Sequence, residues 1–101
     1  MKIFLSGPMS GLPAFNYPAF ERAASFIRSR GHDCLNPAET DEDTSLDRSY
    51  YMRAALMDLL VADALVYLPG SEYSEGATTE RRVAKALDLP VWSMEHFKRK
   101  C

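Results

Sequence analysis

This 101-residue sequence lacks the residues that would build a disulfide-bonded or metal-stabilised protein. Its two cysteines, Cys34 and Cys101, lie far apart in different contexts, so neither a disulfide framework nor a cysteine metal site is indicated. Its two histidines, His32 and His96, have no second histidine or cysteine at ligand spacing. We therefore predict no metal site and no cofactor.

Long apolar runs are absent as well. No run approaches the ~20 residues that a membrane helix requires. The N-terminal stretch MKIFLSGP lacks the apolar region of a signal peptide. We therefore expect a cytoplasmic protein without a membrane partner.

An excess of positive charge is also missing. Twelve Lys and Arg residues stand against fourteen Asp and Glu residues, and the formal net charge is −2. Because binding of duplex nucleic acid requires a basic surface, we expect no such partner.

With 47% hydrophobic residues the chain can bury one core, which predicts a single domain over residues 1–101. Domains this small often gain stability by pairing, so a homodimer or a higher homo-oligomer is expected.

Short apolar runs alternate with helical patterns along the chain. They predict strands at 2–6, 32–36, 62–70 and 90–93, and helices at 17–30, 48–62, 76–87 and 94–100. The helix over 48–62 is predicted from the spacing of its apolar residues, Met52, Leu56, Leu59 and Leu60. Residues 38–47 are acidic and show no period, which predicts a solvated loop that is either a lid over the site or a linker.

This alternation predicts an α/β fold. Parallel strands need crossover connections, so a parallel sheet with helices on both faces is expected. We predict a small flavodoxin-like three-layer sandwich with a parallel sheet of about four strands. In such sheets ligands bind beyond the carboxyl ends of the strands. Three segments fall there: SGPMSGL, NPAE and PGSEYSEGATTE.

The first of these segments offers groups that suit a ligand. Gly7 and Gly11 allow the backbone to approach a ligand closely, and Ser6 and Ser10 carry hydroxyl groups. A tight turn without a ligand accounts for these residues equally well. The segment matches neither the Walker loop nor the dinucleotide-binding glycine pattern.

The third segment leads into the helix at 76–87. Ser74 and Gly76 lie at its N-terminus, where unpaired N–H groups and the helix dipole favour an anion such as a phosphate. The alternative is that Ser74 or Thr78 merely caps the helix.

Glu80 lies in the first turns of the same helix. Its neighbours at three and four residues, Val83 and Ala84, are apolar, which places Glu80 near the edge of the buried face. The basic residues around it are expected on the solvated side: Arg81, Arg82 and Lys85.

A resemblance to a known family is carried by four stretches: MKIFLSGPMSGLPAFNYPAF, GHDCLNPAE, YYMRAALMDLLVADALVYLPG and SEGATTERRVAKALDLPVW. Together they resemble the DUF4406 type, a family of small and often phage-encoded proteins. That family looks related to nucleoside 2-deoxyribosyltransferases and 2′-deoxynucleoside 5′-monophosphate N-glycosidases. The resemblance covers nearly the whole chain and implies a nucleoside 2-deoxyribosyltransferase-like fold.

The resemblance also implies an activity. In those enzymes a Glu on the helix after the third strand attacks the anomeric carbon of the deoxyribose and releases the base, and the matching residue is Glu80. A carboxylate suits an oxocarbenium-like centre that becomes a covalent ester. Six residues earlier, the monophosphate hydrolases carry a Ser that holds the 5′-phosphate, and Ser74 matches it. The resemblance therefore implies hydrolysis or transfer at the N-glycosidic bond of a small (deoxy)nucleoside 5′-monophosphate.

Further site residues follow from the resemblance. The first loop contacts base and sugar in the relatives, which implies these pocket residues: Phe4, Ser6, Gly7, Pro8 and Met9. A second subunit completes the pocket in the relatives, and the aromatic candidates for that interface are Tyr50, Tyr51 and Tyr73.

At two positions this sequence lacks the residue type that the related enzymes carry. Ala55 stands where they carry an acidic residue that orients sugar and nucleophile, and Ser10 stands where the hydrolases carry a basic one. Asp58, one turn beyond Ala55, is either a catalytic acid that faces the same site or a solvent-facing charge.

Three functions remain open. The first is an enzyme with Glu80 as the nucleophile. The second is a non-catalytic nucleotide-binding or regulatory protein that keeps the pocket but lacks the partner acid. The third is a structural role, in which Glu80 is a carboxylate made favourable by a helix start.

Overall fold

The computed structural model describes residues 1–9, 11–39 and 48–100. Its sheet has the order β2-β1-β3-β4, and all neighbouring strands are parallel. The strands are β1 (Lys2–Ser6), β2 (Asp33–Leu35), β3 (Ala64–Tyr67) and β4 (Val91–Ser93). This order is flavodoxin-like, so the predicted fold class is confirmed. Ser10 and residues 40–47 of the expected loop lie outside the described residues.

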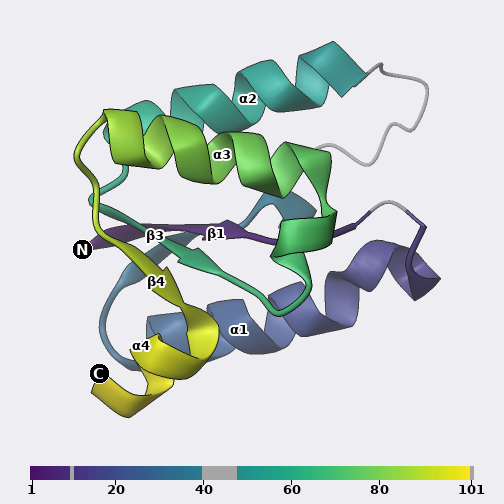
Figure 1. Cartoon of the computed structure of the whole chain (residues 1–101). Coiled ribbons are helices and arrows are strands. Elements are labelled where there is room, and N and C mark those ends of the chain that lie inside the picture. The colour runs from purple at the N-terminus through teal and green to yellow at the C-terminus, as the bar shows by residue number, and fades with distance from the viewer. Residues whose placement is uncertain (10, 40–47, 101) are drawn as a thin grey trace.

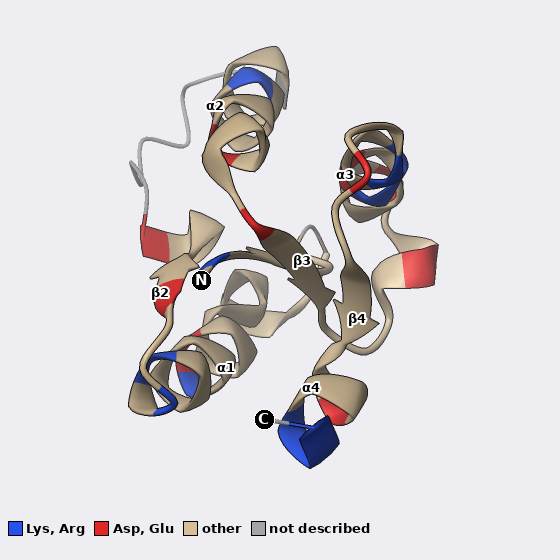
Figure 2. Cartoon of the chain, turned by 90° about the vertical axis from the view of Figure 1, so that its left-hand side faces the viewer, with Lys and Arg blue, Asp and Glu red and all other residues tan. Residues whose placement is uncertain are grey.

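Helices cover both faces of the sheet (Figure 1). One face carries α1 (Tyr17–Ser29) and α4 (Met94–Lys100), and the other carries α2 (Arg48–Val61) and α3 (Glu75–Ala86), as the end-on view of Figure 2 also shows. Three short turns were not predicted: η1 (Pro13–Asn16), η2 (Pro37–Glu39) and η3 (Ser71–Tyr73). Within the described ranges, no helix has the length and apolar character needed to span a bilayer.

The central strand β1 contributes to two separate cores. Ile3 and Leu5 pack with residues of α1 and α4, whereas Phe4 packs with Ala55 and Leu59 of α2 on the opposite face. Successive side chains of a strand point to opposite faces. The last residue of β1 therefore has its side chain on the same side as Phe4, beneath α2 and α3.

Hydrogen bonds at both ends hold β1 in register with β3. At the amino end, the Asp63 amide donates to the Lys2 carbonyl and the Asp63 carboxylate accepts from the Lys2 amide, both at 2.7 Å. At the carboxyl end, the Leu68 amide donates to the Ser6 carbonyl at 2.8 Å. A slip by one residue would turn every side chain of β1 to the other face. These bonds therefore decide which helices Ser6 faces.

The helix α2 is present as predicted, but its buried face differs from the expected one. Leu59 is fully buried, whereas Leu60, which was expected to share that face, is 68% exposed. The buried face instead includes Ala55, and Ala62 directly after the helix is buried as well; their small side chains let the helix lie close to the sheet.

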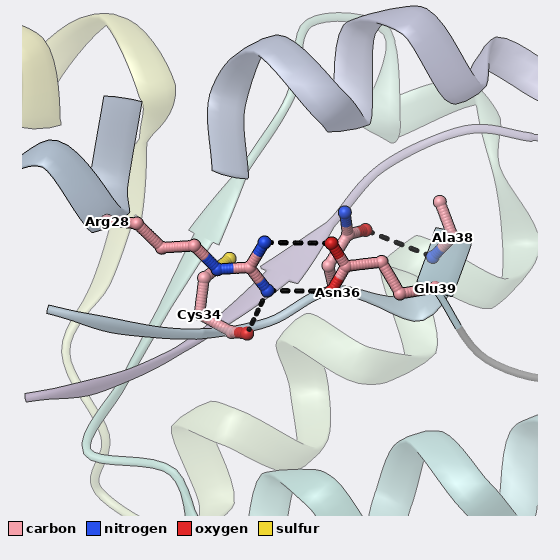
Figure 3. Close-up of polar contacts among 5 residues, drawn as sticks. All are labelled: Arg28, Cys34, Asn36, Ala38 and Glu39. Carbon is pink, nitrogen blue, oxygen red and sulfur yellow. Dashed lines mark hydrogen bonds and ion pairs between the residues drawn. The ribbon is translucent and has the colours of Figure 1, made fainter. Parts of the chain in front are cut away.

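A cluster of polar contacts ties α1 to the end of β2 (Figure 3). The Arg28 guanidinium donates to both carboxylate oxygens of Glu39, at 2.8 and 2.6 Å, and to the Cys34 carbonyl at 3.0 Å. The Asn36 side-chain oxygen accepts from the Ala38 amide at 3.0 Å. The predicted ligand segment NPAE is thus part of this structural cluster, which lowers the pKa of Glu39, chiefly through its hydrogen bonds from Arg28.

Gly7 directly follows β1 and is required by packing. A Cβ atom built on it would lie 2.9 Å from the Cβ atom of Leu68, closer than real side chains approach one another. By contrast, a Cβ atom on Gly76 would lie 3.7 Å from the Met52 side chain, an ordinary contact.

We therefore expect Gly7→Ala to lower the free energy of unfolding by about 1–3 kcal/mol, as overpacking does in other cores. Gly76→Ala is the matched control and is expected to leave stability unchanged or raised, because alanine favours a helix. Urea denaturation of both variants measures the difference. Equal stability of Gly7→Ala and the wild type would contradict the packing argument.

Candidate functional site

The site is centred on a contact between one residue of β1 and one residue of α3, which lie 74 positions apart in the chain. The Ser6 hydroxyl donates a hydrogen bond to Oε1 of Glu80 at 2.7 Å. Ser6 is the last residue of β1 and has no exposed surface, while Glu80 lies in the second turn of α3 and is partly buried. The contact therefore lies at the carboxyl edge of the sheet, where ligands bind in such folds.

Burial changes the acidity of Glu80. Loss of solvent raises the pKa of its carboxyl group from the ordinary 4.5 to about 7, and the hydrogen bond from Ser6 opposes this rise only in part. No ion pair to Glu80 occurs among the described residues. At neutral pH both the acid and the carboxylate are therefore populated, a property common in groups that take part in catalysis.

The N-terminus of α3 is capped as one of the two sequence hypotheses predicts. The Ser74 side-chain oxygen accepts from the Ala77 amide at 3.2 Å, whereas the Thr78 hydroxyl donates back to the Ser74 carbonyl at 2.8 Å. Ser74 is thus the capping residue and Thr78 is not. The cap uses the oxygen of Ser74 as an acceptor, and its hydroxyl proton has no acceptor among the described residues.

The loop after β1 and the loop after β3 meet at the carboxyl edge of the sheet. A Cβ atom on Gly70 would lie 3.5 Å from the Pro8 ring, so the two loops are in contact. The Asn16 side chain donates to the Pro8 carbonyl at 3.0 Å and so ties the first loop to the start of α1. Met9 packs against the core shared with α1. The structure therefore gives Pro8 and Met9 a part in holding the loop.

Phe4 is placed beneath the site and has no exposed surface. It packs with Ala55 and Ala84 in the core between the sheet and its two covering helices. Phe4 therefore has no exposed surface through which it could contact a ligand. Ala55 is nearly buried in the same core, so α2 presents a methyl group at that position.

The structure does not bring Asp58 into contact with Glu80. Helices that connect parallel strands run opposite to them, so residue 58 lies one turn farther than residue 55 from the carboxyl edge. Among the described residues Asp58 makes no hydrogen bond and no ion pair. The same part of the chain holds no group of three or more His, Cys, Asp or Glu residues that could bind a metal.

Sequence reasoning missed one pair at this edge. The Arg81 guanidinium stacks over the Tyr67 ring, 4.1 Å from its centre, and both residues are half-buried. Arg81 is therefore only partly exposed, although it lies on the side of α3 that carries the exposed Arg82 and Lys85, as expected. Tyr67 pairs with Ser6 in the sheet register, so it too lies at the carboxyl edge. Successive strand residues point to opposite faces, so Tyr67 shares a face with the buried Leu65 two residues earlier. This signal could have placed the Tyr67 ring beneath α3.

A separate open groove lies at α3, whose basic residues are on the side away from α2 in Figure 2. Its lining residues are Glu72, Thr78, Arg81, Arg82 and Lys85. Glu80 is absent from this lining because its side chain points to β1. The basic groove and the contact between Ser6 and Glu80 therefore lie on different sides of the helix.

The raised pKa of Glu80 predicts a stability that falls as pH rises from about 4.5 to about 7. In that range the unfolded chain loses the proton of Glu80 while the folded chain keeps it. Above pH 7 both states are ionised and the loss, roughly 3 kcal/mol, is complete. We expect Glu80→Gln to remove this loss and to be more stable than the wild type at pH 8.

Thermal unfolding at pH 5 and at pH 8 checks this expectation. The control is Glu21→Gln, which removes an exposed carboxylate on the opposite face of the sheet and should follow the wild type. A Glu80→Gln variant less stable than the wild type at pH 8 would show that the carboxylate stabilises the fold.

Comparison with solved structures supports the fold. The chain superposes with a TM-score of 0.73 on the 2-deoxyribosyltransferase of the psychrotolerant bacterium Bacillus psychrosaccharolyticus, at 22% identity, covering 92% of this chain and 71% of that one. It superposes with a TM-score of 0.71 on a conserved protein from Enterococcus faecalis V583, at 27% identity, covering 92% of this chain and 62% of that one. The chain is thus shorter than both of these structural relatives.

Sequence comparison identifies the family. None of the curated proteins matches the chain significantly. The model of the family DUF4406, described as a domain of unknown function, matches residues 1–93. With its nucleoside 2-deoxyribosyltransferase-like fold and a match over nearly its whole length, the chain belongs to the DUF4406 family.

Proposed function

We propose that this protein cleaves the N-glycosidic bond of a small (deoxy)nucleoside 5′-monophosphate, with Glu80 as the nucleophile. The observation that carries the proposal is the buried Glu80 carboxyl group, held by Ser6 at the carboxyl edge of the sheet. The likeness in fold to a 2-deoxyribosyltransferase supports the choice of a nucleoside-like substrate.

The chemistry follows from the two oxygens of Glu80. Oε1 accepts the hydrogen bond from Ser6, and Oε2 accepts none from the described residues. In the ionised state, Oε2 attacks the anomeric carbon as the bond to the base breaks, and the base leaves with the bonding electrons and takes a proton from water. Water then hydrolyses the resulting ester and returns Glu80 to its starting state, as in retaining glycosidases.

The start of α3 supplies the group that selects a monophosphate. The Ser74 hydroxyl proton has no acceptor among the described residues, and the first N–H groups of the helix favour an anion. Ser74 and Glu80 are six residues apart, which is roughly 9 Å along a helix. A sugar that bears a 5′-phosphate would span a separation of this order, with its anomeric carbon at Glu80 and its phosphate at Ser74.

The purely structural role of Glu80 is opposed by its environment. A carboxylate kept for stability near a helix start would have a lowered pKa, whereas burial raises the pKa of Glu80. The ionised side chain therefore destabilises the fold at neutral pH. Residues that lower stability in this way are typical of functional sites.

A nucleotide-binding protein without catalysis is the second candidate, and the position of Ala55 favours it. The α2 face beside the site offers a methyl group and no acid, and Asp58 lies a turn farther from the edge. Under this alternative a monophosphate binds at Ser74 and the start of α3, and no base is released.

The decisive experiment incubates the protein with a panel of deoxynucleosides and their 5′-monophosphates and measures released base by chromatography. We expect release from monophosphates by the wild type and at least a hundredfold less by Glu80→Gln, because an amide is a poor nucleophile. Glu21→Gln should behave as the wild type. Binding of a monophosphate without base release would establish the second candidate instead.

The proposal also predicts a pH profile. Attack requires the ionised carboxyl group, and its pKa is about 7. Base release should therefore rise between about pH 6 and pH 8 and then level off. A rate that is constant over this range would argue against Glu80 as the nucleophile.

A further inference from the structure

The hydroxyl of Ser6 is the only group of the described residues that hydrogen-bonds the carboxyl group of Glu80. It is fully buried at the end of the central strand, where the Ser6 carbonyl is already bonded to the Leu68 amide. Pairing with Tyr67 on the neighbouring strand fixes the backbone of Ser6 further. The hydroxyl therefore projects from a backbone that the sheet holds in place, which suits a group that must fix another side chain.

We propose that Ser6 is the positioning residue of Glu80: it holds one carboxylate oxygen still and leaves the other directed for attack. This inference rests on the proposed function, because it assigns the device that prepares the nucleophile. A glutamate side chain has several rotatable bonds, and fixing one oxygen restricts them before the substrate arrives.

The surroundings of Glu80 leave this task to Ser6. On α2, Ala55 presents only a methyl group. Titratable groups occur on each neighbouring element: Tyr50, Tyr51, Arg53 and Asp58 on α2, Tyr67 on β3, and Glu75, Arg81, Arg82 and Lys85 on α3 itself. Arg81 is stacked on Tyr67, and none of these groups forms a hydrogen bond or ion pair with Glu80 among the contacts of the described residues.

The hydroxyl also sets how much of Glu80 is ionised. Burial raises the pKa of the carboxyl group, and the hydrogen bond from Ser6 lowers it. A serine achieves this without adding a charge to the site and without titrating in the physiological range. Without the bond, a smaller fraction of Glu80 would be ionised at neutral pH.

A merely structural role for Ser6 gives a different expectation. A buried hydroxyl that only satisfies its own polarity would affect stability when removed, but not the titration of Glu80. Ser71, the first residue of η3, provides the matched control, because it too is a fully buried serine, and its hydroxyl has no hydrogen-bond partner among the described residues.

The test compares Ser6→Ala with Ser71→Ala in the full chain. NMR titration of the isotope-labelled Glu δ-carbons, with the Glu80 signal assigned by its loss in Glu80→Gln, measures the pKa of Glu80 directly. We expect Ser6→Ala to shift the midpoint upward by roughly 1 pH unit, the size expected for a lost hydrogen bond to a charged group. Ser71→Ala should leave it in place.

Base release gives the second readout. We expect the pH midpoint of activity to move upward in Ser6→Ala by the same amount, with a roughly tenfold lower rate at pH 6, where the ionised fraction limits the rate. If Ser6→Ala fails to fold, Ser6→Cys, whose thiol is a weak donor, serves in its place. An unchanged Glu80 titration in whichever variant folds would overturn the inference.

The two proposals fail in distinguishable ways. Absence of base release by the wild type from every nucleoside and monophosphate would overturn the proposed function, and with it the role of Ser6 in positioning a nucleophile. The NMR titration would still show whether Ser6 controls the ionisation of Glu80. If the wild type is active and Ser6→Ala has an unchanged pH profile and rate, the positioning role alone is overturned.

Discussion

The structure depends on the pairing of β1 with a neighbour on each side. Its backbone bonds to β2 and β3 place it at the centre of the sheet, and its alternating side chains supply both cores. The bonds between Lys2 and Asp63 and between Ser6 and Leu68 close the register at both ends. Because register decides the face to which each side chain points, the same bonds that build the core also bring the Ser6 hydroxyl beneath α3.

The site combines a stable frame with an unfavourable group. The sheet, the close packing of Gly7 on Leu68 and the Ser74 cap each stabilise the region around the carboxyl edge. Glu80, in contrast, is a partly buried carboxyl group, and the Ser6 hydroxyl gives it the one hydrogen bond from a described residue that offsets the loss of solvent. Such a group is tolerated where the stabilising interactions of the surrounding structure offset the free-energy cost of burying it. This contrast is the physical reason for placing function at Glu80.

Ser74 shows that a structural and a functional role need not exclude each other. As a cap, its oxygen accepts a hydrogen bond from the Ala77 amide. As a phosphate ligand, its hydroxyl would donate a proton that the cap does not use. The two sequence hypotheses for this residue therefore concern different atoms of one side chain, and confirmation of the cap leaves the anion proposal standing.

The sequence by itself determined the order and type of the main elements. Strand-length apolar runs and helical spacing were sufficient for β1, α1, α3 and the parallel arrangement, because these features depend on local patterns and on the crossover rule. The local pattern also placed Glu80 near a buried face. It was insufficient for α2, which is apolar on several sides, so that Leu60 is exposed although it was expected on the buried face, which includes the small residue Ala55.

Only the tertiary structure decided which groups meet. The hydrogen bond between Ser6 and Glu80 joins residues 74 positions apart, and the stacking of Arg81 on Tyr67 joins a helix to a strand. No local pattern contains these contacts, because they depend on register and on the height at which α3 crosses the sheet. The acidity of Glu80 likewise arises from burial, which is a property of the folded chain and not of its neighbours in sequence.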